Sequence, residues 1–548
     1  MYFAVRKKRA LWGGYPRFKN SLNSIDRNTA ASDKNTMPSV LVATSVGGHL
    51  AAATMEGLIS VALKRRGANV SAYLCDGVLS ACMDCEHRRF ALEFLQEQLI
   101  MRGPGALCID CFAPAKKMYD SAAIHSIRYG ENIELLDIEN ISKITNEIKI
   151  EDIRDFKYCD ASVGEHAYAG ALRFFARADL EGEKFGEGIL RTYLKAAMIA
   201  AVSIQNLLNK KHFDVVVLNH GIYVPQGVIA EVSKNRGVRV VTWNPSYRAK
   251  TFVFSHDTTY HHTLMSEPIS TWENLTLTKQ IYQKITSYLD GRRHGLSDWI
   301  WFHRQPNFAI QEYAKCKKID LNCTTVLMLT NVAWDAQLHY PANAFSNMFE
   351  WVKTTISYFE SRKDLQLIIR IHPAEINSSV PSRQRTEDEI KRNFPQLPDN
   401  IIVVGANDPI STYSLIEIAK TALIYGTKTG VEITALGIPV IVAGEAWIRG
   451  KGLTVDVRSE REYLDALNQL PLPPLSHDTK ERALKYAYHF FFRRMIPLSM
   501  VEKKKGWPPY FLNVDSLDSL DDGKDLGLDV ICNGILHGAP FVFPDETV

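Results

Sequence analysis

Residues 421–456 read TALIYGTKTGVEITALGIPVIVAGEAWIRGKGLTVD, the pattern of a strand, a glycine-containing turn, a short helix and a second strand. The apolar run at 421–425 has the length and bounds of a buried strand. The residues where the helix should begin are Gly426, Thr427, Thr429 and Gly430. Glycines let the backbone approach a ligand, hydroxyls donate hydrogen bonds, and a helix N-terminus presents N–H groups to an anion. The segment predicts a phosphate-binding turn, although the same residues also serve ordinary turn and capping chemistry.

The second strand of this segment, 438–443, should carry further polar groups to the same edge of the sheet. Arg449 and Lys451 follow it and are candidate cations for a phosphate, with a solvated surface position as the alternative. Glu432 lies on the short helix and could bind the hydroxyls of a ribose. The segment therefore offers both an anion site and a sugar site.

A second segment, LQLIIRIHPAE at 365–375, predicts another strand end with polar residues. Its apolar run ends at Ile371 and is followed by His372, Pro373 and Glu375. In an open parallel sheet, ligands gather at the carboxyl ends of the strands. We therefore expect His372 to hydrogen-bond or neutralise a phosphate in the same crevice as the 426–430 turn.

Four motifs together resemble a known family. They are TNVAWDAQ at 330–337, RIHPAE at 370–375, YGTKTGVE at 425–432 and PVIVAGEAWIRGKGLTVD at 439–456. In order and spacing they resemble the bacterial capsule polysaccharide biosynthesis proteins of the GT-B glycosyltransferase type, which include the Kdo transferases of capsule assembly. The resemblance is specific in the C-terminal half and looser before residue 320.

This resemblance implies a glycosyltransferase with an α/β fold, in which two Rossmann-like domains face a central cleft. It implies a nucleotide-sugar donor, with a CMP-sugar favoured over a UDP- or GDP-sugar, and an oligosaccharide or lipid-linked glycan as acceptor. The expected donor-site residues are His372, Glu375, Thr427, Thr429, Gly430, Glu432, Arg449 and Lys451. Two other functions stay open: a nucleotide-sugar epimerase-type enzyme of the same fold, and a non-catalytic polysaccharide assembly or binding protein.

The strand and helix patterns divide the chain into five parts. A βαβ pattern at 40–74 and a second at 213–244 predict an N-terminal Rossmann-like domain with a helical insertion. The expected parts are a disordered tail at 1–37, the N-terminal acceptor-side domain at 38–270, a helical connector at 271–322, the nucleotide-sugar domain at 323–475, and a C-terminal helix and tail at 476–548 that cross back.

Cysteines form a second cluster within the N-terminal domain. They are Cys75, Cys82, Cys85, Cys108 and Cys111. Two C-x-x-C pairs approximate a structural zinc site, with a gap slightly longer than usual, and an iron–sulfur cluster is a less favoured alternative. Since four ligands suffice, one cysteine is spare, and Cys82 or Cys85 is the doubtful member. Unliganded thiols are the other interpretation, because nothing routes the chain to an oxidising compartment.

Sugar transfer needs a base to take the acceptor's proton. His49 in Gly47-Gly48-His49 follows the first strand, His220 follows a later strand, and Glu165 beside His166 is a weaker candidate. Either histidine could instead be structural. The chain contains no D-x-D motif, so we expect transfer without a bound divalent metal, with the leaving phosphate stabilised by backbone dipoles and cations.

Composition excludes several other classes. The net charge of +3 and the lack of a Lys/Arg stripe argue against a nucleic-acid partner. No apolar run approaches the roughly 20 residues that span a bilayer, and the basic N-terminus lacks the apolar core of a secretory signal. We therefore expect a cytoplasmic enzyme, with peripheral contact to the inner membrane or to a polysaccharide assembly complex as a further option.

Overall fold

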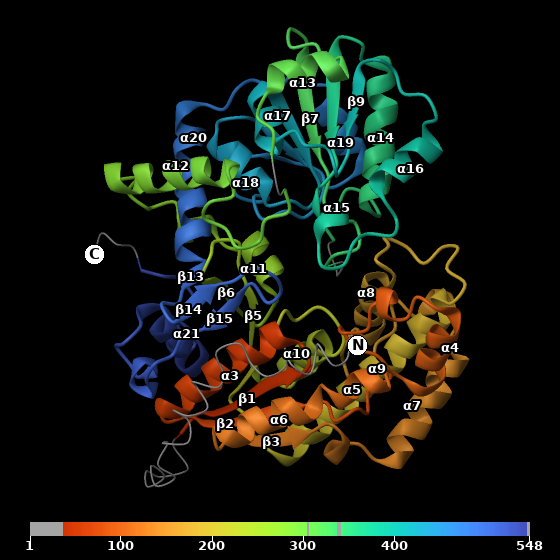
Figure 1. Ribbon diagram of the computed structural model, residues 1–548, viewed down its shortest axis with the longest axis vertical. Helices are drawn as coiled ribbons and strands as arrows, with labels where there is room; N and C mark the ends of the chain where they lie inside the picture. The colour runs from red at the N-terminus through yellow and green to blue at the C-terminus, as the bar shows by residue number, and fades with distance from the viewer. Residues whose placement is uncertain (1–36, 304–305, 337–340, 545–548) are drawn as a thin grey trace. The chain divides into compact units, whose positions relative to one another are not determined.

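The computed structural model describes residues 37–303, 306–336 and 341–544, so the expected tail lies outside the described residues except for Met37. Two compact units divide the chain (Figure 1). Unit 1 comprises residues 37–175, 179–260 and 493–544, and unit 2 comprises 176–178 and 261–492 apart from the gaps. Each unit is a layered α/β structure around a mainly or wholly parallel sheet, so the predicted class of two Rossmann-like domains is confirmed.

The sheet of unit 1 has the order β13-β6-β5-β4-β1-β2-β3. Its parallel strands are β1 (Ser39–Ser45), β2 (Asn69–Leu74), β3 (His125–Arg128), β4 (Val215–Asn219) and β5 (Arg239–Pro245). Antiparallel strands extend it at one side, namely β6 (Thr251–His256) and β13 (Ile496–Pro497). The order 3-2-1-4-5 is that of a Rossmann sheet, whose topological switch point lies between β1 and β4.

The helices of unit 1 include the predicted ones. They are α3 (Leu50–Arg65), α4 (Glu93–Arg102), α5 (Ala106–Ile109), α6 (Phe112–Ser121), α7 (Leu135–Glu147), α8 (Val163–Phe175), α9 (Gly186–Lys210), α10 (Gln226–Asn235) and α21 (Leu526–His537). A small ribbon of β14 (Val501–Lys503) and β15 (Tyr510–Leu512) lies near the C-terminus.

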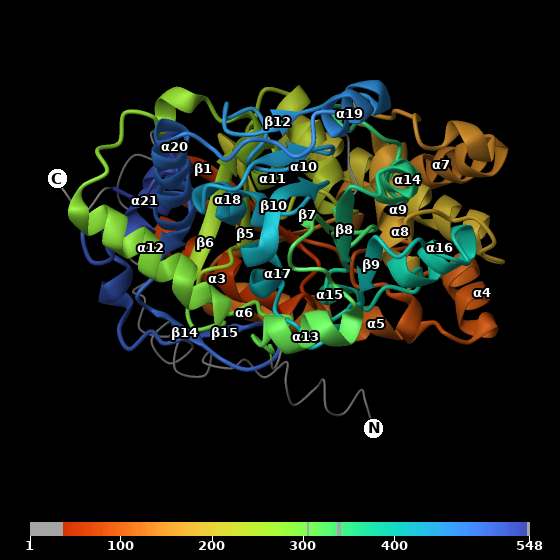
Figure 2. The same ribbon diagram turned by 90° about the horizontal axis from the view of Figure 1, so that it is seen from above.

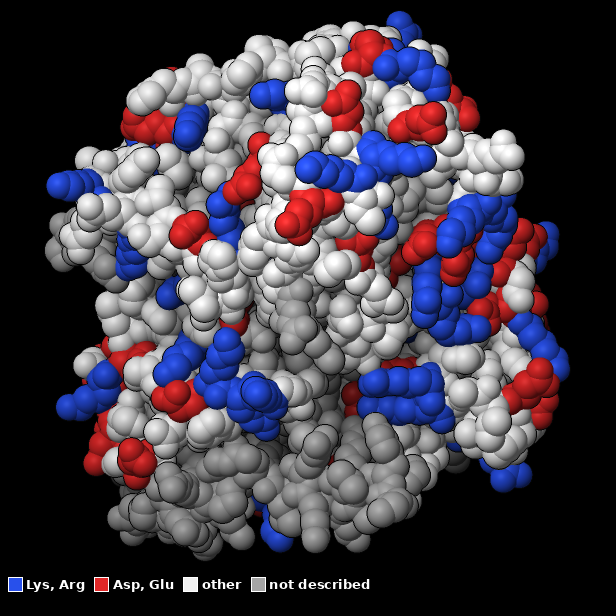
Figure 3. Space-filling view, turned by 45° about the horizontal axis from the view of Figure 1, so that its top comes forward, with Lys and Arg blue, Asp and Glu red and all other residues white. Residues whose placement is uncertain are grey.

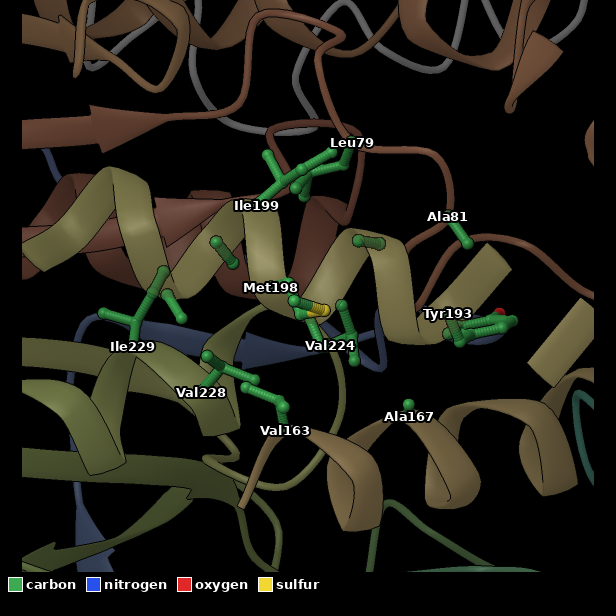
Figure 4. Close-up of a cluster of buried hydrophobic side chains, with 14 of the residues drawn as sticks. Leu79, Ala81, Val163, Ala167, Tyr193, Met198, Ile199, Val224, Val228 and Ile229 are labelled. Carbon is green, nitrogen blue, oxygen red and sulfur yellow. The ribbon is translucent and has the colours of Figure 1, made fainter. Parts of the chain in front are cut away.

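Helix α9 is the centre of the unit 1 core. Its apolar residues cover most of its circumference, so it is buried by neighbours on several sides. In Figure 4 its Met198 and Ile199 lie among side chains of α8, α10 and the loop after β2. The same helix contributes Tyr193, whose hydroxyl lies 3.1 Å from the carbonyl oxygen of Cys82 and donates to it. The core thereby fixes the cysteine-containing loop.

All strands of the unit 2 sheet are parallel, in the order β12-β11-β10-β7-β8-β9. They are β7 (Thr324–Leu329), β8 (Leu365–Arg370), β9 (Ile401–Val404), β10 (Ala419–Ile424), β11 (Val440–Val442) and β12 (Val455–Asp456). This is again the Rossmann order, with its switch point between β7 and β10. Figure 2 shows β10, β7 and β8 side by side in the middle of the unit. These strands are nearly continuous apolar runs because helices cover both faces of a parallel sheet.

The helices of unit 2 are α11 (Tyr260–Ser266), α12 (Lys279–Arg293), α13 (Ile310–Lys317), α14 (Met348–Ser361), α15 (Ala374–Asn377), α16 (Thr386–Asn393), α17 (Thr412–Ile418), α18 (Thr429–Ala435), α19 (Glu460–Leu467) and α20 (His477–Tyr488). Helix α14 is capped at its N-terminus by Asn347, whose side chain accepts the N–H groups of Phe349 and Glu350. Its buried Trp351 packs in the core on one face of the sheet. A π-helical turn, His489–Arg493, follows α20.

Surface charge is mixed. On the face shown in Figure 3, Lys and Arg side chains occur with Asp and Glu side chains among them, in line with the small net charge of +3. In the described part of the chain, no helix has both the length and the apolar character needed to cross a membrane.

Candidate functional site

Three neighbouring strands of unit 2 end in polar residues at one edge of the sheet. Strand β7 leads to Thr330 and Asn331, β8 to His372, and β10 to Thr427. The His372 N–H donates to Thr330 Oγ1 at 3.0 Å, so the ends of β7 and β8 are joined directly. Asn331 Oδ1 is buried without a hydrogen-bond partner among the described residues. The edge therefore offers polar groups at the switch point, where Rossmann sheets bind ligands.

His372 is held in one tautomer. Its Nδ1 accepts the N–H of Ala374 at 3.0 Å, so the proton of the neutral ring lies on Nε2. Burial, with the nearby positive charges of Lys428 and Arg370, lowers the pKa of His372 to about 4. The imidazole is therefore neutral at physiological pH. It can donate one hydrogen bond to a phosphate oxygen, but it does not supply the positive charge that the sequence motif suggested as one option.

The turn after β10 is ordered by its own hydroxyls. The Thr427 hydroxyl oxygen accepts the N–H of Thr429 at 3.3 Å and lies 3.2 Å from the Thr429 hydroxyl oxygen, to which it donates. A Cβ at Gly430 would lie 2.5 Å from Ile424 Cδ1, so this glycine lets α18 pack closely on β10. Thr427 and Thr429 are the groups of the turn that can face a ligand, whereas Gly430 serves packing.

Lys428, between the two threonines, was not singled out from the sequence. Its Nζ lies 3.0 Å from Glu432 Oε1, and burial, followed by the positive charge of Arg292, lowers its pKa. It acts on His372 electrostatically, so it brings a positive charge to the same edge. The signal in the sequence was a lysine inside the hydroxyl-rich turn YGTKTG. Lys428 is therefore a candidate cation for an anionic ligand at this edge, besides its pairing with Glu432.

Glu432 is the centre of a buried ion-pair network. It contacts Arg292 Nε at 3.0 Å and accepts the Tyr413 hydroxyl at 2.6 Å, besides pairing with Lys428. Burial raises its pKa, but Arg292 and Lys428 outweigh that effect and bring it to about 2. Arg292 pairs in turn with Asp298. Both carboxylate oxygens of Glu432 thus have partners within the protein, which favours a structural role over ribose binding.

Three other predicted donor residues also have protein partners. Glu375 accepts the N–H and hydroxyl of Thr386 at the start of α16, and burial raises its pKa to about 7. Arg449 donates to the carbonyl oxygens of Val442, Gly444 and Val457. Lys451 is fully buried and donates to the carbonyl oxygens of Met265 and Glu267 at 3.0 and 2.8 Å. The structure places these three side chains in the framework of unit 2 and not in the His372–Thr427 group.

In unit 1 the two candidate histidines follow adjacent strands at the other switch point. His49 follows β1 and begins α3, and His220 follows β4 with a φ of 67°. His49 Nδ1 lies 3.8 Å from Asp84 Oδ1, and both side chains are 15% exposed. The His220 ring packs 5.2 Å from that of Tyr223. A partly exposed histidine beside a carboxylate can act as a base oriented by its neighbour, so His49 has the better geometry.

Two buried carboxyl groups of unit 1 have different surroundings. Glu165 lies in the first turn of α8, and the adjacent His166 contacts the Ile222 carbonyl oxygen at 2.6 Å and Glu231 at 3.1 Å. Glu56 on α3 was not singled out from the sequence. It accepts the Trp243 Nε1–H at 3.1 Å, and burial raises its pKa to about 7. Both glutamates are buried, in contrast to His49.

The clustered cysteines lie beside the His49 loop. Gly48 N–H donates to Cys111 Sγ at 3.1 Å. Burial raises the pKa of Cys75 to about 11, and burial together with the neighbouring Cys82 and Cys75 thiols raises that of Cys108 to about 12. Among the described residues, no group of three or more His, Cys, Asp or Glu side chains has the arrangement that holds one metal ion. The zinc site expected from the sequence is therefore not supported.

Comparisons with known proteins give a distant likeness. No protein-family model and no curated protein matches the chain. Among solved structures it is similar to KpsC β-Kdo 2,4 transferase from Thermosulfurimonas dismutans, with 12% identity, 50% of this chain and 79% of that chain covered, and a TM-score of 0.33. The chain is also similar to the β-Kdo 2,7 transferase of the same organism, with 13% identity, 58% of this chain and 88% of that chain covered, and a TM-score of 0.31.

A third similar structure is a UDP-GlcNAc 2-epimerase from Methanocaldococcus jannaschii, solved with UDP-GlcNAc and UDP. Its identity to this chain is 11%, the match covers 82% of this chain and 98% of that chain, and the TM-score is 0.26. The solved structures similar to this chain thus include two Kdo transferases and an epimerase, each with less than 25% identity and a TM-score below 0.5.

Proposed function

We propose that unit 2 binds a nucleotide-activated sugar at the ends of β7, β8 and β10, and that the protein is a glycosyltransferase acting on a surface or capsular polysaccharide. The observation that carries the proposal is the convergence of Asn331, His372 and Thr427 at the switch point of an all-parallel Rossmann sheet. The motif resemblance adds the donor class, with a CMP-sugar first and UDP- or GDP-sugars as alternatives.

The donor phosphate is bound by hydrogen bonds and one positive charge. His372 donates from Nε2, the Thr429 hydroxyl, which accepts that of Thr427, donates to a phosphate oxygen, and Lys428 supplies the charge. As the glycosidic bond of the donor breaks, negative charge grows on the leaving phosphate, so the same groups stabilise the transition state. This set needs no divalent ion, and we expect transfer to proceed in its absence.

In unit 1, we assign the base to His49, with Asp84 stabilising the imidazolium that forms when it takes the acceptor's proton. His220 and Glu165 are the alternatives. The acceptor is an oligosaccharide or lipid-linked glycan, whose handling would bring the protein to the inner membrane or to an assembly complex.

The test is a turnover assay. The protein is incubated with CMP-, UDP-, GDP- and dTDP-sugars, with and without an oligosaccharide acceptor, and the released nucleotide and the sugar product are measured. We expect nucleotide release that depends on the acceptor and survives EDTA. Conversion of the donor sugar without an acceptor would make the protein an epimerase-type enzyme, and binding without turnover under either condition would make it a binding protein.

A further inference from the structure

The ribbon of β14 and β15 in unit 1 carries a basic, aromatic tip. The two strands run antiparallel, and the Lys504 N–H donates to the Pro509 carbonyl oxygen at 2.9 Å, which closes the loop between them. We call residues 503–507, with the sequence KKKGW, the ribbon tip. Its three consecutive lysines concentrate positive charge at one place on the surface, and such a place attracts an anionic partner.

The ribbon tip is exposed to solvent. Trp507 keeps 53% of its surface exposed, and the side chains of Lys503 and Lys505 are exposed as well. The other tryptophans that the structure describes are buried or half-buried, so Trp507 differs from all of them. A tryptophan in the core is an ordinary packing residue, whereas tryptophans at the surface are enriched where proteins bind a partner.

The ribbon is fixed beside the turn that carries His49. The Tyr510 hydroxyl donates to the Ala51 carbonyl oxygen at 2.6 Å, and the Tyr510 ring packs edge-on against Phe252, with 5.3 Å between the ring centroids. Figure 1 shows the ribbon beside α3, which begins directly after His49. The Trp507 ring centroid lies 6.4 Å from that of His49. The exposed tip thus borders the histidine that we assign as the base.

The position and the chemistry of the tip together indicate its ligand. A base takes the proton of the acceptor's hydroxyl, so the acceptor must contact His49. An indole offers a flat apolar face to the C–H groups of a sugar ring, and its N–H can donate to a sugar hydroxyl. Lysine ammonium groups bind carboxylate or phosphate groups and attract them from a distance. A neutral glycan would engage the indole but not the lysines.

We propose that the ribbon tip binds the acceptor, and that the acceptor is an anionic glycan. Trp507 stacks on a sugar ring, and Lys504 and Lys505 bind carboxylate or phosphate groups of that sugar or of its neighbours. This proposal rests on the proposed function, because it names the acceptor class of the same reaction. It also adds residues that lie outside the four motifs of the family resemblance.

The first experiment measures glycan binding by the full chain without a donor. The tryptophans are labelled with fluorine, the NMR signal of Trp507 is assigned with Trp507→Phe, and three probes are titrated: tetragalacturonate, phosphorylated maltotetraose and neutral maltotetraose. We expect an anionic probe to shift the Trp507 signal and to bind at least about tenfold more tightly than neutral maltotetraose. Whether tetragalacturonate or phosphorylated maltotetraose binds more tightly distinguishes carboxylate from phosphate recognition.

Matched variants distinguish the tip from surface charge in general. The double variant Lys504→Gln/Lys505→Gln removes two charges of the tip, and Lys210→Gln/Lys420→Gln removes two exposed charges elsewhere. The first should weaken binding of the anionic probe about tenfold or more, and the second less than about twofold. Trp507→Ala should also weaken it about tenfold or more. Circular dichroism checks the fold of each variant.

Three results would overturn the proposal. One is the absence of any shift of the Trp507 signal with the three glycan probes. The second is equal affinity of the anionic probe for the parent and for folded Lys504→Gln/Lys505→Gln, or equal affinity of the parent for anionic and neutral probes. The third is tighter binding of octathymidylate than of either anionic glycan, which would assign the tip to a nucleic acid.

Turnover distinguishes failure of this proposal from failure of the proposed function. In the transfer assay, Lys504→Gln/Lys505→Gln should raise the KM for the acceptor about tenfold, with kcat and the Kd of the donor unchanged. Glycan binding at the tip of a protein that transfers no sugar would contradict the glycosyltransferase and support the tip. Sugar transfer with the same acceptor KM in the parent and in both tip variants would support the glycosyltransferase and contradict the tip.

Discussion

Replacing Glu432 by glutamine tests whether this carboxylate stabilises unit 2 or binds the donor's ribose. The side chain is 1% exposed and contacts Arg292 at 3.0 Å and Lys428 at 3.0 Å. Glutamine keeps the size and one acceptor oxygen but removes the charge. Two buried cations would then lose their common counter-charge.

Two arguments give the loss of stability expected in Glu432→Gln. The shift in the pKa of Glu432 from 4.5 to about 2 corresponds to about 3 kcal/mol of stability at neutral pH. Removing one member of a buried ion pair costs about 3–5 kcal/mol. We therefore expect the free energy of unfolding of unit 2 to fall by about 3–5 kcal/mol in Glu432→Gln.

The assay is urea unfolding followed by tryptophan fluorescence, with nucleotide-sugar affinity measured in parallel. Because folding lowers the pKa of Glu432, its stabilisation is fully present above pH 4.5 and is lost as the pH falls through 2. The difference in free energy of unfolding between parent and variant should therefore narrow between these pH values. Glu417→Gln is the matched control. Glu417 is 49% exposed in its pair with Arg293, so its loss should cost less than about 1 kcal/mol.

This reasoning would be refuted by a Glu432→Gln variant whose free energy of unfolding lies within about 1 kcal/mol of the parent's but which binds nucleotide sugar much more weakly. It would return Glu432 to the ribose-binding role that the motif first suggested.

Three further predictions concern Gly47 in the loop after β1, Arg449 in the framework of unit 2, and the proposed base His49. Gly47→Ala should destabilise unit 1 by about 1–3 kcal/mol in thermal unfolding, because its Cβ would lie 2.4 Å from Ala115 Cβ. Gly291→Ala on α12, whose Cβ would lie at an ordinary contact distance of 3.6 Å from Ser297 Oγ, should be neutral or stabilising. Arg449→Met should cost about 2–4 kcal/mol in urea unfolding by leaving buried carbonyl oxygens unpaired, while nucleotide affinity stays within twofold. His49→Gln should lower kcat at least about 100-fold with donor binding unchanged, and full activity would transfer the base to His220.

Much of the fold could be predicted because its elements are locally encoded. The strand at 324–329 and the helix at 226–235 coincide with β7 and α10, since each is an apolar or amphipathic run bounded by turn residues. The placement of the ends of β8 and β10 at one edge of the sheet was also expected, because parallel strands align their carboxyl ends. Strand order is not local, so the position of Asn331 between them at the switch point was not foreseen.

The roles of long charged side chains could not be predicted for the same reason. Glu432 pairs with Arg292, which is 140 positions away, and Lys451 donates to the carbonyl oxygen of Met265, which is 186 positions away. A local motif shows a charge near a turn but not the distant partner that neutralises it. The cysteines show a related limit: their spacing suggested a metal site, but among the described residues no group of three or more His, Cys, Asp or Glu side chains has the arrangement that holds a metal ion.

Isothermal titration of the parent protein with nucleotide sugars tests the central claim most directly, that the donor binds at the ends of β7, β8 and β10. His372→Ala and Thr429→Ala should each weaken the Kd about tenfold or more, because each removes a hydrogen bond to a charged phosphate. Thr354 lies on α14, and its hydroxyl donates to Glu460 at the start of α19. Thr354→Ala should therefore leave the Kd unchanged. If both site variants bind the nucleotide sugar as tightly as the parent, the donor site lies elsewhere and the account is wrong.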